Sequence, residues 1–296
     1  MMKYKMEDPD LSVLVSPEKR DTAVGEIEFA EIGEGPAVIA LHGAMGGYDQ
    51  GLILAQTVAE SGYRFIAVSR PGYLGTPLSS GKSPEAQGDL MAALLDSLHI
   101  SHAGVLAVSG GGPAAIQFGL RHGDRCRGLV LISTYADKMD MRIPFSFKIA
   151  TFLAGFPRCA AMFRKKAQKD LKAVARRSVR DPEIFQETVN DPEIWPLFSA
   201  MLLRTYERMD QRMEGTKNDT ETLLTATFPL EKLALPVLVV HGTQDPLLPH
   251  DIHVSMFGER IPGVEIFSVE GGEHVAVFTH RKEIREKVSA FMQRNF

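Results

Sequence analysis

Short apolar runs alternate with longer mixed segments along the first half of the chain. The runs occupy residues 37–41, 65–68, 105–108 and 129–132. Uninterrupted apolar runs of four or five residues are typical of strands that are buried on both faces of a parallel sheet. Helical periodicity fills the segments between them, over about residues 52–61, 84–98 and 113–122. This alternation predicts a doubly wound α/β fold.

The alternation stops at residue 135 and resumes after residue 228. Helical patterns punctuated by prolines fill this interval, and strand patterns return at 237–240 and 264–269 before an amphipathic helix over 281–292. We therefore expect a core domain made of residues 1–134 and 229–296, with residues 135–228 inserted as a helical cap. Upstream, residues 25–32 predict a half-exposed strand at the antiparallel edge of the sheet.

A serine lies on a turn between an apolar run and a predicted helix, in the sequence Ala107-Val108-Ser109-Gly110-Gly111. A nucleophile on such a tight turn needs small residues two positions before and after it, because the backbones approach closely there. The usual pattern is G-x-S-x-G, and Ala107 replaces its first glycine. A spectator serine on a glycine-rich turn is the alternative, since a short motif is only a hypothesis until its context agrees.

Two later residues supply that context. Serine attacks only when a base takes its proton, and an acid must orient that base. Asp245 follows the end of one late predicted strand, and His274 follows the end of the next. Catalytic groups gather at the carboxyl ends of strands in open α/β sheets, and the chain order Ser, Asp, His matches one known arrangement.

In these residues and in their order, the chain resembles the α/β-hydrolase superfamily, in the branch with a helical cap after the sixth strand. The resemblance starts near residue 22 and spans nearly all of the chain. It is carried, besides the serine turn, by the segments 42–47 (HGAMGG), 70–75 (RPGYLG), 241–245 (HGTQD) and 272–274 (GEH). It implies an α/β-hydrolase fold, a triad of Ser109, Asp245 and His274, and an oxyanion hole formed by the backbone N–H groups of Ala44 and Gly110.

Other candidate groups receive different interpretations. We interpret His42 as a residue that shapes its turn, because His274 already fills the role of base. Asp137 follows the sixth strand, where some relatives place the acid, and it remains an alternative to Asp245. His250 and His253 share a predicted helix face, but no carboxylate or cysteine pattern accompanies them. We therefore expect them on a solvated surface, with neither a metal nor an organic cofactor.

Composition limits the classes of protein that need to be considered. Of 296 residues 44% are hydrophobic and 24% are charged, the net charge is −4, and only two cysteines are present. These values are typical of a soluble globular protein, and they give no indication of nucleic acid as a partner. Neither a leader pattern nor a long apolar stretch is visible, so we expect a cytoplasmic protein without stable membrane insertion.

One segment of the predicted cap is strongly basic. Its cationic residues, opposed only by Asp170, are Arg158, Arg164, Lys165, Lys166, Lys169, Lys172, Arg176, Arg177 and Arg180. The simpler interpretation is a solvated helix face. The alternative is attraction to an anionic substrate or to a membrane surface.

The identity of residue 109 narrows the reaction. Epoxide hydrolases and haloalkane dehalogenases of this superfamily carry aspartate there, so a serine leaves acyl chemistry. We expect hydrolysis of a carboxylic ester, or a related acyl bond, of a small and mainly apolar substrate. Carbon–carbon bond hydrolysis, lactone hydrolysis and a slow-turnover small-molecule receptor remain alternatives, and a homodimer remains open. The apolar side chains of Met45, Phe145, Trp195 and Phe198 are expected to line the pocket, or else to form the core of the cap.

Overall fold

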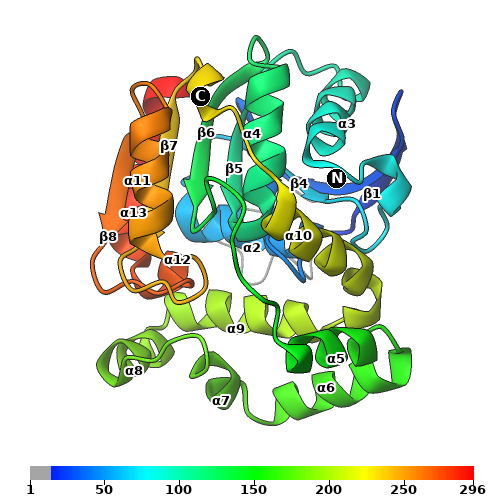
Figure 1. Cartoon of the computed structure of the whole chain (residues 1–296), viewed down its shortest axis with the longest axis vertical. Coiled ribbons are helices and arrows are strands. Elements are labelled where there is room, and N and C mark those ends of the chain that lie inside the picture. Colours follow the sequence, from blue (N-terminus) through cyan, green and yellow to red (C-terminus); the bar gives the residue numbers. More distant parts are fainter. Residues whose placement is uncertain (1–14) are drawn as a thin grey trace.

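The computed structural model describes residues 15–296 and builds them around an eight-stranded sheet (Figure 1). The strands are β1 Glu18–Asp21, β2 Glu26–Ile32, β3 Ala37–Leu41, β4 Arg64–Ser69, β5 Ala103–Val108, β6 Cys126–Ile132, β7 Val237–Gly242 and β8 Glu265–Val269. Their order across the sheet is β1-β2-β4-β3-β5-β6-β7-β8. The strand β2 is antiparallel to both of its neighbours, and the other strand pairs are parallel. The predicted fold class is confirmed.

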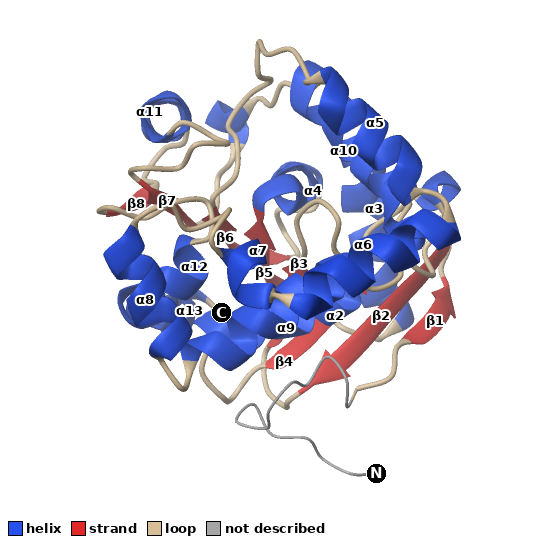
Figure 2. Ribbon diagram, turned by 90° about the horizontal axis from the view of Figure 1, so that it is seen from below, coloured by secondary structure: helices blue, strands red, loops and turns tan. Residues whose placement is uncertain are grey.

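Helices cover both faces of the sheet and the carboxyl ends of its strands (Figures 1 and 2). The core helices are α2 Tyr48–Val58, α3 Pro84–Ser97, α4 Gly112–Arg121, α11 His250–Arg260, α12 Ala276–Thr279 and α13 Arg281–Asn295. Buried side chains of α2 and α13 pack on one face, and those of α3, α4 and α11 pack on the other. Burial from both sides explains the apolar runs in the central parallel strands β3 to β7, whereas β8 at the edge has a mixed sequence and is partly exposed.

The strand that we expected at the edge lies one position further in. Residues 27–30 of β2 are buried, because β1 pairs with β2 on its outer side. The sequence of β1, Glu-Lys-Arg-Asp, is charged throughout and gives no apolar signal. Charged side chains are common on edge strands, where they discourage pairing with another chain. The strand predicted at residues 25–32 is confirmed as Glu26–Ile32, but its expected half-exposed position at the edge of the sheet was wrong.

The segment between β6 and β7 is helical, as the sequence indicated. Its helices are α5 Phe145–Ala154, α6 Pro157–Lys169, α7 Leu171–Ala175, α8 Pro182–Asn190, α9 Ile194–Tyr206 and α10 Met213–Thr225. Helices α5 to α9 lie beyond the carboxyl ends of the strands (Figure 1). Within residues 15–296, no helix combines the length and the apolar character needed to cross a membrane.

The last part of this segment is attached to the core. The N–H of Gly215 in α10 donates to the carbonyl of Gly72 (2.8 Å), and the N–H of Leu74 donates to the carbonyl of Gln211 (2.9 Å). Nearby, Arg212 is fully buried and its Nη2 lies 2.6 Å from Oδ2 of Asp49 in α2. The boundaries of the cap, residues 135–228, stay a prediction. Within them, α5 to α9 form the outer layer and α10 returns to the core.

Candidate active site

Ser109 occupies a strained turn at the end of β5. Its φ is 49°, in the left-handed region that side chains other than glycine rarely adopt. The surroundings hold this conformation, because the hydroxyl of Thr134 donates to the carbonyl of Ser109 (2.7 Å). A Cβ on Gly111 would lie 2.8 Å from the carbonyl oxygens of Leu41 and His42 at the end of β3. The second small residue of the turn is thus required by the close approach of two strand ends.

The structure brings the three predicted triad residues into one chain of hydrogen bonds. His274 Nε2 lies 3.1 Å from the Oγ of Ser109, and its Nδ1 lies 2.8 Å from Oδ2 of Asp245. The other carboxylate oxygen of Asp245 accepts from the backbone N–H groups of Leu247 (2.9 Å) and Leu248 (3.0 Å). The Ser109 hydroxyl can therefore pass its proton to an imidazole whose tautomer and orientation are fixed by a carboxylate.

The environment of Asp245 keeps it ionised. Burial opposes its charge, but hydrogen bonding and charge interaction with His274, together with the two backbone donors, outweigh burial and lower its pKa. His241 lies behind the carboxylate, 3.5 Å from Oδ2, and burial lowers the pKa of its imidazole. A neutral His241 adds no second cation that would compete with His274 for the acid.

The two predicted oxyanion donors lie next to each other. The backbone nitrogen of Ala44 is 3.3 Å from the position that a Cβ on Gly110 would occupy. Gly43, which precedes Ala44, also packs against the nucleophile, since its own Cβ would lie 3.2 Å from the Cβ of Ser109. The parallel pairing of β3 with β5, which sets Leu41 opposite Ala107, produces this approach.

Two buried side chains fix the peptide that carries the Ala44 N–H. The carbonyl of Gly43 accepts from His42 Nδ1 (2.6 Å) and from Arg70 Nη2 (3.3 Å). A trans peptide points its N–H opposite to its C=O. Because Gly43 directs its carbonyl toward Arg70 inside the protein, the Ala44 N–H points away, toward the serine turn.

The hydrogen bonds of His42 define its protonation. Its Nε2 accepts from the backbone N–H of Arg70 (3.0 Å), so the proton is on Nδ1, which donates to Gly43. Burial and the neighbouring charge of Arg70 lower the pKa of His42 well below its ordinary value. A neutral imidazole in this position shapes the loop, in line with our interpretation of His42.

The partner of Arg70 could not be identified from the sequence. The guanidinium forms a two-pronged ion pair with Asp219 of α10, with distances of 2.8 and 2.5 Å, and the Arg70 side chain is only 1% exposed. The Tyr73 hydroxyl donates to the same carboxylate (2.5 Å). A Cβ on Gly110 would lie 2.8 Å from Asp219 Oδ2, so this carboxylate packs directly behind the serine turn. Arg70 balances the negative charge of this carboxylate, and the Tyr73 hydroxyl stabilises it through a hydrogen bond.

The four predicted pocket residues have different surroundings. Met45 packs with apolar side chains of α5 and α6, with Met209 just before α10 and with Met213 at its start, so the loop that carries Ala44 contacts the inserted helices. Phe198 is buried, and its ring stacks on Phe278 with centroids 4.9 Å apart, which makes it part of the packed interior between α9 and α12. Trp195 is partly buried beside Phe198. Phe145 lies on α5 with 76% of its surface exposed.

The cap also contacts the loop that carries the base. Arg180, between α7 and α8, pairs with Glu273 (Nε to Oε2, 2.6 Å), and Glu273 immediately precedes His274 in the sequence. The Glu273 side chain is nearly buried, whereas that of Arg180 is half-exposed. Arg180, one of the cationic residues of the cap segment, is therefore ion-paired next to the loop that carries His274.

The remaining candidate residues from the sequence lie away from His274 or contact other groups. Asp137 pairs with Arg260 (3.3 Å) and not with His274. His253 is buried and accepts from the N–H of Ala136 (3.3 Å), so its expected place on a solvated surface was wrong. The reason is that this side of α11 packs on the core. Among residues 15–296, no three His, Cys, Asp or Glu side chains are grouped so that they could hold a metal ion.

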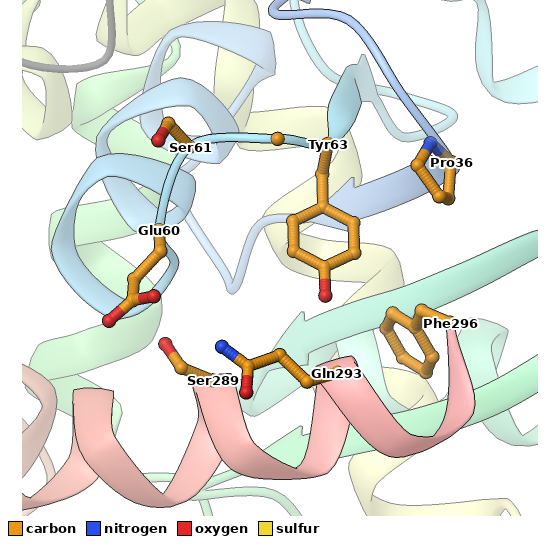
Figure 3. Close-up of a pocket in the computed structure, with 8 residues that line it drawn as sticks. Pro36, Glu60, Ser61, Tyr63, Ser289, Gln293 and Phe296 are labelled. Atoms are coloured by element: carbon orange, nitrogen blue, oxygen red, sulfur yellow. The ribbon is translucent and has the colours of Figure 1, made fainter.

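One cavity of the structure lies far from the triad. It has a volume of about 310 Å³ and is lined by Pro36, Glu60, Ser61, Gly62, Tyr63, Ser289, Gln293 and Phe296 (Figure 3). Pro36 and Tyr63 precede β3 and β4, so this cavity opens at the amino ends of the strands. The triad lies at the opposite, carboxyl ends, and the cavity is not part of its site.

Comparisons with known proteins bear on the fold of the chain. A family model described as "alpha/beta hydrolase fold" matches residues 36–281. The Bacillus subtilis protein named "Uncharacterized hydrolase YcgS" is 26% identical over 258 residues, which cover 85% of this chain and 89% of that protein. A 2-hydroxy-6-oxononadienedioate/2-hydroxy-6-oxononatrienedioate hydrolase of Burkholderia vietnamiensis is 23% identical over 281 residues, covering 90% of this chain and 91% of that one.

A solved structure with the α/β hydrolase fold also matches nearly the whole chain. An α/β hydrolase fold protein from Nakamurella multipartita is 29% identical and has a TM-score of 0.82. The match covers 94% of this chain and 99% of that protein. The likeness therefore includes both the core and the inserted helices.

Proposed function

Because the chain belongs to the α/β hydrolase family and is a hydrolase of that fold, we propose that it cleaves carboxylic esters of small, mainly apolar molecules through an acyl-enzyme. The observation that carries the proposal is the hydrogen-bonded chain from Ser109 through His274 to Asp245. These three residues supply a nucleophile, its base and the acid that orients the base, without any further group.

The first half of the reaction forms the acyl-enzyme. The Oγ of Ser109 attacks the ester carbonyl carbon while its proton passes to His274 Nε2. The carbonyl oxygen becomes an oxyanion, which accepts hydrogen bonds from the N–H groups of Ala44 and Gly110. As the tetrahedral species collapses, His274 gives its proton to the leaving alkoxide, and the alcohol departs.

The second half repeats these steps with water. His274 takes a proton from a water molecule, whose oxygen attacks the acyl carbon of the Ser109 ester. The second oxyanion is held by the same two donors. Collapse returns the proton to the Oγ of Ser109 and releases the carboxylic acid.

The charges around the site favour an uncharged substrate. Three arginines reach the loops of the site, and each has a carboxylate partner: Arg70 with Asp219, Arg180 with Glu273, and Arg212 with Asp49. Arginines engaged in this way offer little attraction to a second anionic group of a substrate. An apolar ester fits these surroundings better than a dicarboxylate.

Carbon–carbon bond hydrolysis is the second candidate. The relative from Burkholderia vietnamiensis acts, by its name, on a dioate, and the match covers 90% of this chain. The same triad could serve that reaction, and it could serve lactone hydrolysis as well. A small-molecule receptor with slow turnover is the candidate from another class.

A substrate screen separates these candidates. We expect p-nitrophenyl esters of graded chain length to be hydrolysed by the wild type and not by Ser109→Ala. Ser133→Ala is a matched control, because Ser133 also has a positive φ (45°) at the end of the neighbouring strand β6. A fluorophosphonate should label Ser109 in the wild type and in the control. Turnover of a vinylogous diketo acid but of no ester would favour the carbon–carbon reaction, and binding without turnover would favour a receptor.

A further inference from the structure

The outer helices of the cap expose an unusual amount of apolar surface. Twelve large hydrophobic side chains in the described part of the chain are exposed, and eight of them lie between residues 141 and 162. These eight are Met141, Phe145, Phe147, Ile149, Phe152, Leu153, Phe156 and Met162. In α5 only Ala154 is buried. Contiguous exposed apolar surface of this kind marks an interaction site.

The same stretch of chain is strongly cationic. Residues 141–180 contain eleven Lys and Arg residues and one acidic residue, Asp170, within a chain whose net charge is −4. This segment is therefore strongly positive, whereas the rest of the protein is net negative. A partner for this surface must therefore be both apolar and anionic.

Helix α6 presents both properties on one face. Its buried residues, Ala160 and Ala167, define the side that packs on the protein. Residues three or four apart share a helix face, so the exposed Met162 lies on the opposite side together with the exposed Arg158, Lys165, Lys166 and Lys169. Apolar and cationic side chains are thus presented outward together.

This surface lies close to the site in the fold. Figure 1 shows α5 and α6 at the end of the molecule beyond the carboxyl ends of the strands, and Figure 2 shows that the two helices meet at one end. The inner residues of the two helices, Ala154 and Ala160, pack in the same small cluster as Met45, which follows the oxyanion donor Ala44. A partner that covers α5 and α6 would therefore sit over the active site.

We propose that the exposed face of α5 and α6 docks on a membrane surface that contains anionic lipids. Aromatic and aliphatic side chains enter the boundary between headgroups and acyl chains, while Lys and Arg attract the lipid phosphates. A second copy of this chain fits less well, because symmetric pairing would bring the two cationic faces together. The docking is peripheral and independent of the chemistry at Ser109.

Vesicle co-sedimentation tests the proposal with the full chain carrying Ser109→Ala, so that hydrolysis plays no part. The probes are vesicles of phosphatidylcholine alone and of phosphatidylcholine with about 30% phosphatidylglycerol. We expect binding to the anionic vesicles that weakens with added salt. Lys165→Glu/Lys166→Glu/Lys169→Glu should weaken it at least about tenfold, since each cation near such a surface contributes substantially. Phe145→Ser/Phe152→Ser should weaken it to a similar degree.

Matched controls distinguish the surface from general charge or apolarity. Lys82→Glu/Lys232→Glu/Lys282→Glu makes the same change of charge at exposed positions outside the cap, and Val24→Ser/Ile252→Ser removes exposed apolar groups elsewhere. Both should bind as the parent does. No binding to anionic vesicles, or equal loss in the controls, would overturn the proposal. So would a dimer, seen by light scattering, that dissociates in the Phe145→Ser/Phe152→Ser variant.

Discussion

Nη2 of Arg70 donates to the carbonyl oxygen of Gly43 over 3.3 Å, and that carbonyl belongs to the peptide whose N–H is the proposed oxyanion donor. The guanidinium thus fixes the orientation of the Ala44 N–H, because it binds the carbonyl oxygen on the opposite side of the same peptide. Its ion pair with a carboxylate of α10 links the donor to the inserted segment as well. Arg70 is a positioning residue in this arrangement, since it contacts no reacting atom.

Replacing this guanidinium should reduce turnover more than binding. Arg70→Lys keeps the charge but cannot reach both Gly43 and Asp219 with a planar fork. We expect kcat to fall about tenfold to a hundredfold, because an oxyanion donor is displaced, with little change in KM. Steady-state kinetics with a p-nitrophenyl ester measures both values. Arg212→Lys is the matched control, a second buried pair that contacts Glu207 and Asp49 instead of the oxyanion loop. Equal loss of kcat in both variants would refute the positioning role.

The identity of the acid can be tested by exchanging single carboxylates for amides. Asp245→Asn should lower kcat about 10³- to 10⁴-fold, because the imidazole loses the partner that fixes its tautomer. Asp137→Asn, which removes only a contact to Arg260, should leave kcat within about twofold. The measurement is ester hydrolysis by both variants after their folding has been checked by circular dichroism. The reverse order of effects would assign the acid to the end of β6.

Acid should destabilise the protein before carboxylates titrate. Burial lowers the pKa of His253 from 6.5 to about 4. Between these values the unfolded chain binds a proton at this residue and the folded chain does not, so the free energy of unfolding falls as pH decreases from about 6.5 to about 4. Urea unfolding at several pH values should show a shallower slope in His253→Gln over that range. Parallel slopes for the two proteins would show that His253 does not carry the effect.

Removal of metal ions should leave the activity unchanged. The proposed reaction uses a serine, an imidazole, a carboxylate and two backbone donors, none of which needs a metal ion. Exhaustive dialysis against EDTA, followed by the ester assay, should give the rate of untreated enzyme. A loss of activity that zinc restores would contradict the mechanism.

The parts of the fold with local signals were predictable from the sequence. The central parallel strands β3, β4, β5, β6 and β7 contain apolar runs, because both of their faces are buried, whereas the edge strand β8 is mixed and partly exposed. The three candidate triad residues could be proposed for a related reason, since each of them follows the end of a strand in the parallel region. The charged strand β1 has no apolar face and was therefore missed.

Contacts between distant segments were not predictable in this way. Arg70 and Asp219 are separated by 149 residues, and Asp49 and Arg212 by 163 residues. No hydrophobic periodicity in the sequence indicates such an ion pair, because the fold determines which carboxylate lies next to which guanidinium. Phe145 and Phe198 illustrate the same limit, because both are aromatic residues of predicted helices. One is exposed and the other buried, and this depends on which helix packs against the core.

The attachment of α10 to the core has a consequence for recombination between relatives. An exchange of the whole inserted segment would separate Asp219 and Arg212 from their core partners and leave two charges buried alone. Junctions placed before Met209 would instead transplant α5 to α9 and keep both ion pairs native. Chimeras of that design should acquire a new substrate preference from the donor while they retain the catalytic rate of the recipient. The inserted segment is thus divided into an exchangeable part and a part that is inherited with the catalytic apparatus.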